Sequence, residues 1–181
     1  MARKKADQPE TEQHGWSAIS GFSSPDSKNR IVIPSSEVSK FCSSNQIEQP
    51  KELVVVPNDT LDGMWGMTNE MFAKLAAAIR AENRDLVKFI YQVRFCFGLD
   101  QKQRRFGPLT PFSELGLVDF KNNERLQIAC SAHQDYQDGG YFLRFALARM
   151  EDGKIKFLNF RRRLAEVFGD DFLSGLDKMR R

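Results

Sequence analysis

The sequence predicts an α+β fold, mainly β, in which two pseudo-symmetric units form one body and a helical appendage follows at the C-terminus. A nine-residue signature occurs twice, at residues 26–34 and 100–108, and Asp, Lys, Arg and Pro stand at the same four places in each copy. The same order of turn, strand, helix and strand runs through both copies. A short unit that is used twice indicates two copies of one structural element, so the repeat decides the predicted architecture.

The spacing between the two copies extends well beyond the signature. Matched residues lie 74 positions apart, and the matched pairs are Asp26 with Asp100, Pro34 with Pro108, Phe41 with Leu115 and Val54 with Ile128. We therefore divide the chain into a flexible N-terminal tail at residues 1–15, a first unit at 16–83, a second unit at 84–150 and a C-terminal helical extension at 151–181.

The first unit begins with a short strand from Trp16 to Phe22, followed by a turn at residues 23–26. A β-branched strand follows at residues 31–33, and Pro34 closes it. Ser35 or Ser36 can cap a short helix, whose expected buried residues are Val38, Phe41 and Cys42.

The rest of the first unit contains two more strands and a helix. The apolar run at residues 53–56 predicts a buried strand, and residues 64–67 predict its partner. Thr68 is the expected N-cap of a helix that extends to about residues 80–83. The apolar stripe of this helix consists of Phe72, Leu75, Ala76 and Ile79.

The second unit has a similar order of elements. Residues 86–97 begin as a helix and become a strand at 93–97. Thr110 and Pro111 open a helix that Gly116 ends, and strands follow at 126–129 and 141–147.

The sequence Glu151-Asp152-Gly153-Lys154 is expected to end the second unit. Beyond it, apolar residues recur at helical spacing up to a stop at Gly169 and continue after it. These residues are Phe160, Leu164, Val167, Phe168, Phe172, Leu173 and Leu176. We expect the stripe to pack on the body or on a neighbouring subunit.

The composition favours a soluble protein without a bound metal or cofactor. Hydrophobic residues make up 41% and charged residues 28%, which are ordinary values for a soluble domain. Cys42, Cys96 and Cys130 lack the spacing of a zinc site or of a small disulfide framework, which favours the reducing cytoplasm. The basic N-terminus has no apolar run behind it, so we expect no signal peptide and no membrane anchor. The net charge of +3 is small, so we expect any anion-binding surface to be local.

Two Asp-x-x-x-Arg motifs carry a resemblance to a known family. Asp26 with Arg30 and Asp100 with Arg104 each stand in the order strand, turn, strand, Pro and helix, and residues 31–34 continue the first motif. Over residues 16–150 the chain resembles MraZ, a family of bacterial transcriptional regulators made of two SpoVT-AbrB units. The resemblance implies swapped-hairpin, double-psi-like units in one barrel-like body, and ring-shaped homo-oligomers. It also implies sequence-specific binding to double-stranded DNA and a cytoplasmic, nucleoid-associated location.

The motif residues have chemistry that suits DNA. An arginine at the start of a strand projects from a rigid element, so Arg30 and Arg104 can bond guanine O6 and N7 in the major groove. A carboxylate cannot usefully face a phosphate. Asp26 and Asp100 are therefore expected to accept hydrogen bonds from the loop backbone or from the motif arginine, which aims the cation.

The neighbouring residues of the two loops complete the predicted DNA-contacting set. Lys28, Lys102 and Arg105 are expected to contact phosphates. Asn29 and Gln103 precede the motif arginines, at a place where the MraZ family commonly has Gly. Asn tolerates a left-handed backbone well, whereas Gln does not.

The alternative to DNA binding is an oligomeric scaffold or protein-interaction module of the same fold. Under this alternative, each Asp–Arg pair is a surface ion pair that only stabilises its turn. Trp65, Phe95, Phe97 and Phe106 could stack on bases, but their strand spacing favours the core.

An enzyme is not expected. His133 lies near Asp135, but the chain has no Ser or Cys nucleophile in an identifiable motif and no metal-ligand spacing. A loop histidine without a catalytic role is therefore the favoured interpretation.

Overall fold

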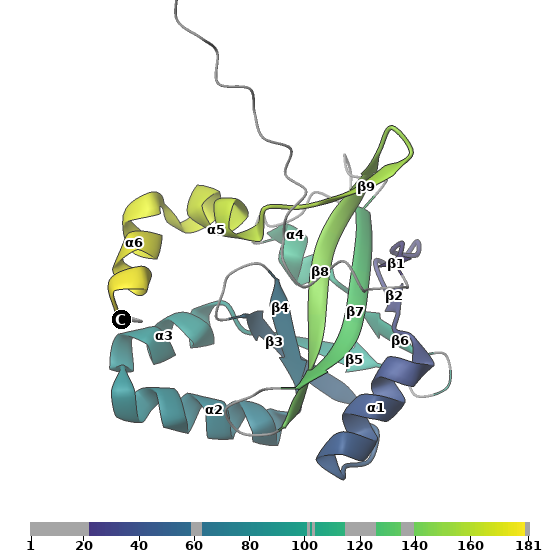
Figure 1. Ribbon diagram of the computed structural model, residues 1–181, viewed down its shortest axis with the longest axis horizontal. Coiled ribbons are helices and arrows are strands. Elements are labelled where there is room, and N and C mark those ends of the chain that lie inside the picture. The colour runs from purple at the N-terminus through teal and green to yellow at the C-terminus, as the bar shows by residue number, and fades with distance from the viewer. Residues whose placement is uncertain are drawn as a thin grey trace, which may run out of the picture.

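The computed structural model describes residues 22–58, 63–100, 102, 104–114, 126–134 and 140–179. Over these residues the fold is α+β, with helices around a nearly closed, barrel-like sheet (Figure 1). Several predictions therefore lie outside the described residues, namely the tail at 1–15, the strand before Phe22, Gln103, the helix stop at Gly116 and Asp135.

Nine strands form this sheet within the described residues, and all of their pairings are antiparallel. The strands are β1 (Phe22–Ser23), β2 (Ile31–Val32), β3 (Glu52–Pro57), β4 (Met64–Met67), β5 (Phe95–Leu99), β6 (Arg105–Gly107), β7 (Leu126–Gln134), β8 (Tyr141–Glu151) and β9 (Lys154–Phe157). Their order is β1-β7-β8-β4-β3-β5-β6-β2, with β9 also beside β8. The backbone N–H of Val32 on β2 donates to Oγ of Ser23 on β1 at 3.2 Å. This bond connects the two ends of the strand order, so the sheet almost closes on itself.

The predicted buried strand at residues 53–56 is confirmed as the centre of β3, which lies between β4 and β5. β5 alternates between the inside and the outside of the barrel, with Phe95, Phe97 and Leu99 buried and Cys96 exposed. This period of two is what a strand with one buried face requires.

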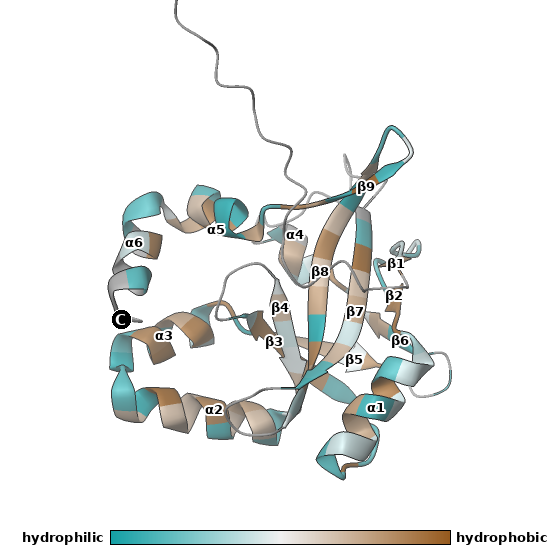
Figure 2. Ribbon diagram, in the orientation of Figure 1, coloured by the Kyte–Doolittle hydropathy of each residue, from teal (hydrophilic) through white to brown (hydrophobic). Residues whose placement is uncertain are grey.

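Aromatic rings fill part of the barrel interior. Phe97 makes edge-to-face contacts with Phe106 and Phe112, at ring-centroid distances of 5.1 and 5.0 Å. Phe106 also stacks on Phe145 at 5.2 Å. Figure 2 shows apolar residues along β3, β7 and β8, and hydrophilic residues at the tip of the β8–β9 hairpin. Phe95, Phe97 and Phe106 are thus core residues, as their strand spacing favours.

Six helices surround the sheet in the described part of the chain. They are α1 (Ser35–Asn45), α2 (Asn69–Glu82), α3 (Arg84–Gln92), α4 (Thr110–Glu114), α5 (Phe160–Phe168) and α6 (Asp170–Met179). The predicted cap of α2 is confirmed, because Thr68 Oγ1 accepts a hydrogen bond from the N–H of Met71 at 3.2 Å.

The predicted cap of α1 is wrong. Pro34 occupies the N-cap position, Ser35 and Ser36 lie inside the first turn, and no side chain caps the helix. The helix can begin directly after Pro34 because the proline already has an extended backbone, with ψ of 131°. Val38 and Phe41 are buried as expected, whereas Cys42 is only half-buried.

Side chains of α1 hold this helix against β7 and β8. The N–H of Ala132 donates to the Glu37 carboxylate at 2.5 Å, and the Asn45 amide makes two hydrogen bonds to the backbone of Tyr141, at 2.9 and 3.0 Å. Backbone groups of both long strands therefore find partners on the helix.

The C-terminal segment packs on the body. Phe160, Leu164 and Leu173 belong to the same buried core as the barrel, and Phe168 contacts Phe89 of α3 with ring centroids 6.0 Å apart. The prediction that helices fill residues 151–181 needs one correction, because β9 lies at the start of this segment.

The residues expected to end the second unit instead form the turn between β8 and β9. Asp152 and Gly153 have φ of 52° and 72°, and Asp-Gly is one of the residue pairs that tight two-residue hairpins favour. The turn signal was therefore present in the sequence, but it joins two strands rather than separating two segments.

The two predicted units share only part of their element order. β1, β2, α1 and β3 have counterparts in β5, β6, α4 and β7. β4 and β8 are the next elements in the two units, but the first unit then ends with α2, whereas the second unit begins with α3.

Candidate functional site

The two signature loops flank a short ladder between β2 and β6. Residues 24–30 lead into β2, and residues 100–104 lead into β6. Ile31 pairs with Phe106, and Val32 pairs with Arg105. Segments that are far apart in the sequence therefore meet at one small surface.

Backbone and carboxylate hydrogen bonds fix the first loop. The Asp26 N–H donates to the carbonyl of Arg30 at 2.8 Å, and the Asn29 N–H donates to the carbonyl of Asp26 at 2.9 Å. Asp26 Oδ1 accepts from the backbone N–H groups of Lys28 and Arg30, each at 2.9 Å. Asn29 has φ of 55°, the left-handed conformation that Asn tolerates better than most residues.

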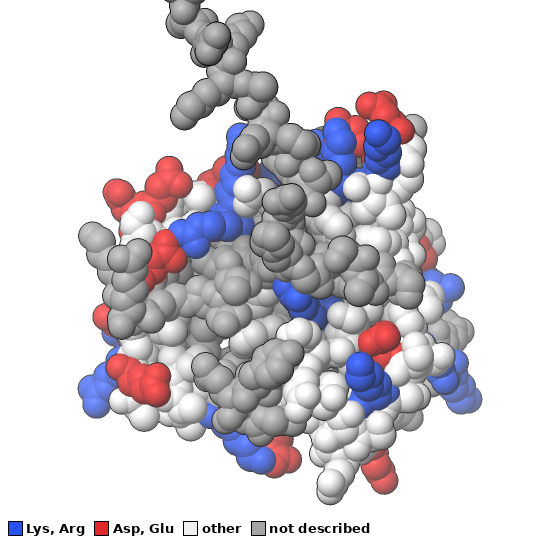
Figure 3. Space-filling view, viewed as in Figure 1, with Lys and Arg blue, Asp and Glu red and all other residues white. Residues whose placement is uncertain are grey.

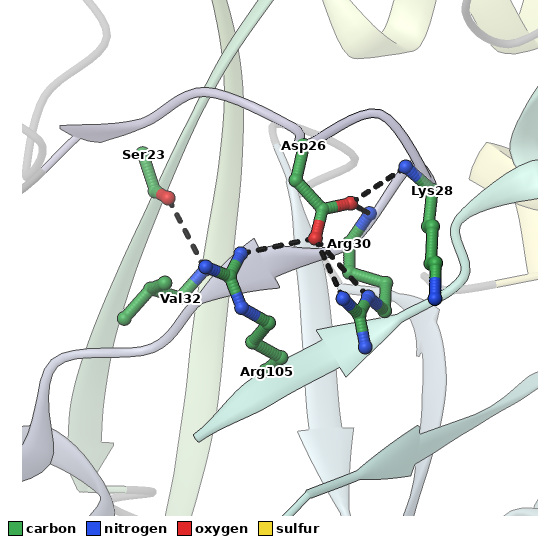
Figure 4. A network of polar contacts seen from close by, with 6 residues as sticks. All are labelled: Ser23, Asp26, Lys28, Arg30, Val32 and Arg105. Atoms are coloured by element: carbon green, nitrogen blue, oxygen red, sulfur yellow. Dashed lines mark hydrogen bonds and ion pairs between the residues drawn. The ribbon is translucent and has the colours of Figure 1, made fainter. Parts of the chain in front are cut away.

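A single oxygen of Asp26 also holds two guanidinium groups. Arg30 donates from Nε at 3.1 Å and from Nη2 at 3.0 Å to Asp26 Oδ2, and Arg105 donates from Nη1 to the same oxygen at 3.0 Å. Figure 4 shows the Asp26 carboxylate between the two guanidinium groups. Both arginines remain partly accessible, with side-chain exposures of 27% for Arg30 and 33% for Arg105.

These contacts change the acidity of Asp26. The backbone hydrogen bond from Arg30 is the largest cause that lowers the pKa of Asp26, and the Arg30 side chain and the Lys28 backbone lower it further. Partial burial opposes them, and the net result is a pKa of about 2. The carboxylate is therefore ionised throughout the physiological pH range.

The second loop repeats the two backbone hydrogen bonds of the first loop and the carboxylate bond to the lysine N–H, and it contains one more residue. The Asp100 N–H donates to the carbonyl of Arg105 at 2.9 Å, and the Arg104 N–H donates to the carbonyl of Asp100 at 2.7 Å. Asp100 Oδ1 accepts from the N–H of Lys102 at 2.8 Å. Arg104 has φ of 53°, so it takes the left-handed position that Asn29 takes in the first loop.

The structural counterpart of Arg30 is therefore Arg105, and the expected match of Arg30 with Arg104 needs correction. The extra residue shifts the residues directly after the loop by one, so that the buried residues Ile31 and Phe106 correspond. A sequence signal for this shift exists, because Arg30 is followed by an apolar residue and, of the two adjacent arginines, only Arg105 is.

The loops together concentrate positive charge. Five cationic side chains, Lys28, Arg30, Lys102, Arg104 and Arg105, stand against the two carboxylates of Asp26 and Asp100, which leaves an excess of three positive charges. On the face seen in Figure 3, basic and acidic side chains are interspersed without one large patch of either sign. The loops are therefore a local anion-binding candidate, as the small net charge leads us to expect.

The Arg30 guanidinium keeps donors for a ligand. Its two bonds to Asp26 use Nε–H and one N–H of Nη2. Among the described residues, no side chain or backbone group bonds the outer edge formed by Nη1 and Nη2. Two adjacent N–H groups of this kind match the paired acceptors of a phosphate or of guanine O6 and N7.

Sequence reasoning missed two residues of this surface, Ser23 and Val32. Ser23 Oγ accepts the N–H of Val32, and the Val32 side chain points away from the core. The alternation of Arg30 and Val32 with the buried Ile31 and Ile33 was a usable signal for the outward direction of Val32.

His133 lies on β7 rather than in a loop, and its side chain is exposed. The described residues contain no group of three or more His, Cys, Asp or Glu side chains that could hold a metal ion. None of the helices in the described ranges has the length and hydrophobicity that crossing a membrane requires.

Comparison with protein-family models, with curated proteins and with solved structures gives no match for this chain.

Proposed function

We propose that the chain is a sequence-specific DNA-binding transcriptional regulator of the MraZ type, with tandem SpoVT-AbrB units in a ring-shaped, nucleoid-associated homo-oligomer. The observation that carries the proposal is the cluster of Asp26, Arg30 and Arg105. One carboxylate holds two partly exposed guanidinium groups beside the exposed Lys28. Rigid, outward-facing arginines are the side chains that most often read guanine in the major groove.

The charge of the cluster argues for a ligand. An ion pair that only staples a turn needs one cation for one anion, and such a pair contributes at most about 1 kcal/mol at a surface. Here two guanidinium groups share one carboxylate oxygen, so they repel each other and leave a surplus positive charge. An anionic partner relieves this repulsion, and a DNA phosphate or base edge supplies the acceptors.

The loop geometry refines the roles that the sequence suggests. Arg30 and Arg105 share Asp26 and are the candidate base readers. Arg104 takes the left-handed turn position, so we assign it to the phosphate backbone together with Lys28 and Lys102.

The test measures duplex binding by fluorescence anisotropy over a salt series, after selection of binding sites from a randomised duplex pool. Arg30→Ala and Arg105→Ala should each weaken binding to selected sites by about 10–100-fold, the range for loss of one bidentate base contact. Lys28→Ala should weaken binding uniformly across sequences and reduce the salt slope by about one.

Two controls make the test specific. Arg84→Ala removes an exposed arginine at the start of α3, away from both loops, and should leave binding unchanged. Arg104→Ala should affect sequence preference less than Arg105→Ala does. If the wild-type protein shows no duplex binding even at low salt, the chain is better explained as an oligomeric scaffold whose Asp–Arg pairs only fix the loops.

A further inference from the structure

Val32 is the most exposed large hydrophobic residue in the described part of the chain, at 44%. Tyr91 and Ile155 follow at 42% and 39%. A single exposed apolar side chain is ordinary on a protein surface. The location of Val32 is what distinguishes it, because it lies within the cationic site rather than elsewhere on the surface.

The register of the sheet places Val32 beside both base-reading candidates. Residues two apart on a strand share a face, so Arg30 and Val32 point outward while Ile31 between them is buried. Val32 is also the direct partner of Arg105 across the ladder. Directly opposed residues have Cβ atoms about 4.5–5.5 Å apart. Figure 4 shows Val32 next to the Arg105 side chain.

The Val32 side chain is held in place before any ligand binds. Its backbone N–H donates to Ser23 Oγ at 3.2 Å, which fixes the strand at this position. A β-branched side chain also has few accessible rotamers. The site therefore presents a rigid apolar group beside its cations, and a surface that only contacted phosphates would not need such a group.

We propose that Val32 is a specificity-determining residue that contacts the C5-methyl group of a thymine, next to the base pair that Arg105 contacts. The proposal rests on the DNA binding proposed above. Thymine is the base that presents a methyl group in the major groove, and apolar side chains are the groups that recognise it. An apolar contact beside a guanidinium group thus fits a thymine methyl group beside hydrogen-bond acceptors.

The experiment removes the thymine methyl group and the Val32 side chain one at a time. Each thymine of a selected duplex is replaced by deoxyuridine, which lacks only the C5-methyl group, and affinity is measured for the wild type and for Val32→Ala. At one thymine per half-site, the replacement should weaken wild-type binding about fourfold, which corresponds to about 0.8 kcal/mol for one methyl-sized group. Val32→Ala should bind the thymine duplex several-fold more weakly and show no further loss with deoxyuridine.

Matched variants separate recognition from folding. Ile155→Ala truncates a comparably exposed residue on the β8–β9 hairpin and should keep the full wild-type response to deoxyuridine. Val32→Thr preserves the β-branched shape and one methyl group while replacing the other by a hydroxyl, and it should keep part of the response. Far-ultraviolet circular dichroism and the unfolding temperature of each variant should match those of the wild type.

The outcomes distinguish this inference from the proposed function. One outcome is that the wild type binds duplex in a way that depends on Arg30 and Arg105, while every thymine replacement changes its affinity and that of Val32→Ala equally. In that case the role of Val32 is wrong and DNA binding stands. If Val32→Ala responds to deoxyuridine as strongly as the wild type, the same conclusion follows. If no duplex is bound at all, the proposed function fails and the role of Val32 fails with it.

Discussion

Substitution of Gly107 on β6 tests how closely β6 approaches the first signature loop. The φ of Gly107 is 134°, a backbone conformation that side chains disfavour. A Cβ atom added there would lie 3.1 Å from the carbonyl oxygen of Asn29, 3.1 Å from the nitrogen of Leu109 and 3.2 Å from Cα of Arg30. All three are backbone atoms, so none can move aside by a simple side-chain rotation. Gly107→Ala should therefore destabilise the protein and disturb the first loop.

The expected size combines two terms. A non-glycine residue in a sparsely populated backbone region costs about 1–3 kcal/mol. Overpacking against neighbours that cannot relax costs about 1–3 kcal/mol more. A total of about 4 kcal/mol, the middle of the summed range, corresponds to a fall of about 8–16 °C in unfolding temperature for a chain of this size.

Urea unfolding followed by circular dichroism measures the effect, and two other glycines serve as matched controls. Gly153 has φ of 72° but no atom near its added Cβ, so Gly153→Ala should show only the backbone term, about 1–2 kcal/mol. The added Cβ of Gly98 lies 3.5 Å from the Gly107 carbonyl oxygen, an ordinary contact without backbone strain. Gly98→Ala should therefore be neutral or slightly stabilising. A Gly107→Ala variant that loses no more stability than Gly153→Ala would show that β6 does not approach Asn29 and Arg30 this closely.

Two further predictions concern the loop carboxylate and a helix cap. Asp26 should titrate with a midpoint near pH 2 in carboxyl carbon NMR, against 3.8 for an ordinary Asp, and Arg30→Ala should raise this pKa because Arg30 supplies the side-chain hydrogen bonds and charge that lower it. Since the folded pKa is depressed, the stability that Asp26 contributes is fully present above pH 3.8 and is lost as the pH falls towards 2; a midpoint at the ordinary value would contradict the described loop. Asn83→Ala should destabilise the protein by about 1 kcal/mol in urea unfolding, because Asn83 Oδ1 caps α3 by accepting from the N–H groups of Asp85 and Leu86, and Asn83→Asp should retain most of that stability. An equal loss in Asn83→Ala and Asn83→Asp would mean that the cap is not the source of the effect.

Local patterns predicted many of the elements correctly. The apolar run of β3, the cap of α2 at Thr68 and the Thr110-Pro111 opening of α4 depend on residues that are close in sequence. The same patterns could not separate a segment boundary from a hairpin turn at Asp152-Gly153. The turn residues are the same in both cases, and only the pairing of β8 with β9 decides between them.

The candidate site divides in the same way. By itself, the sequence determined the contact of Asp26 with Arg30, because the four-residue spacing lets one carboxylate reach both the backbone and the side chain of the same loop. Only the tertiary structure decided that Arg105, which is 79 residues away, shares that carboxylate and is the counterpart of Arg30. It also decided that Val32 lies beside them. The physical reason is that the ladder between β2 and β6 sets which side chains face outward together, and one extra residue in the second loop changes that register in a way that motif spacing does not record.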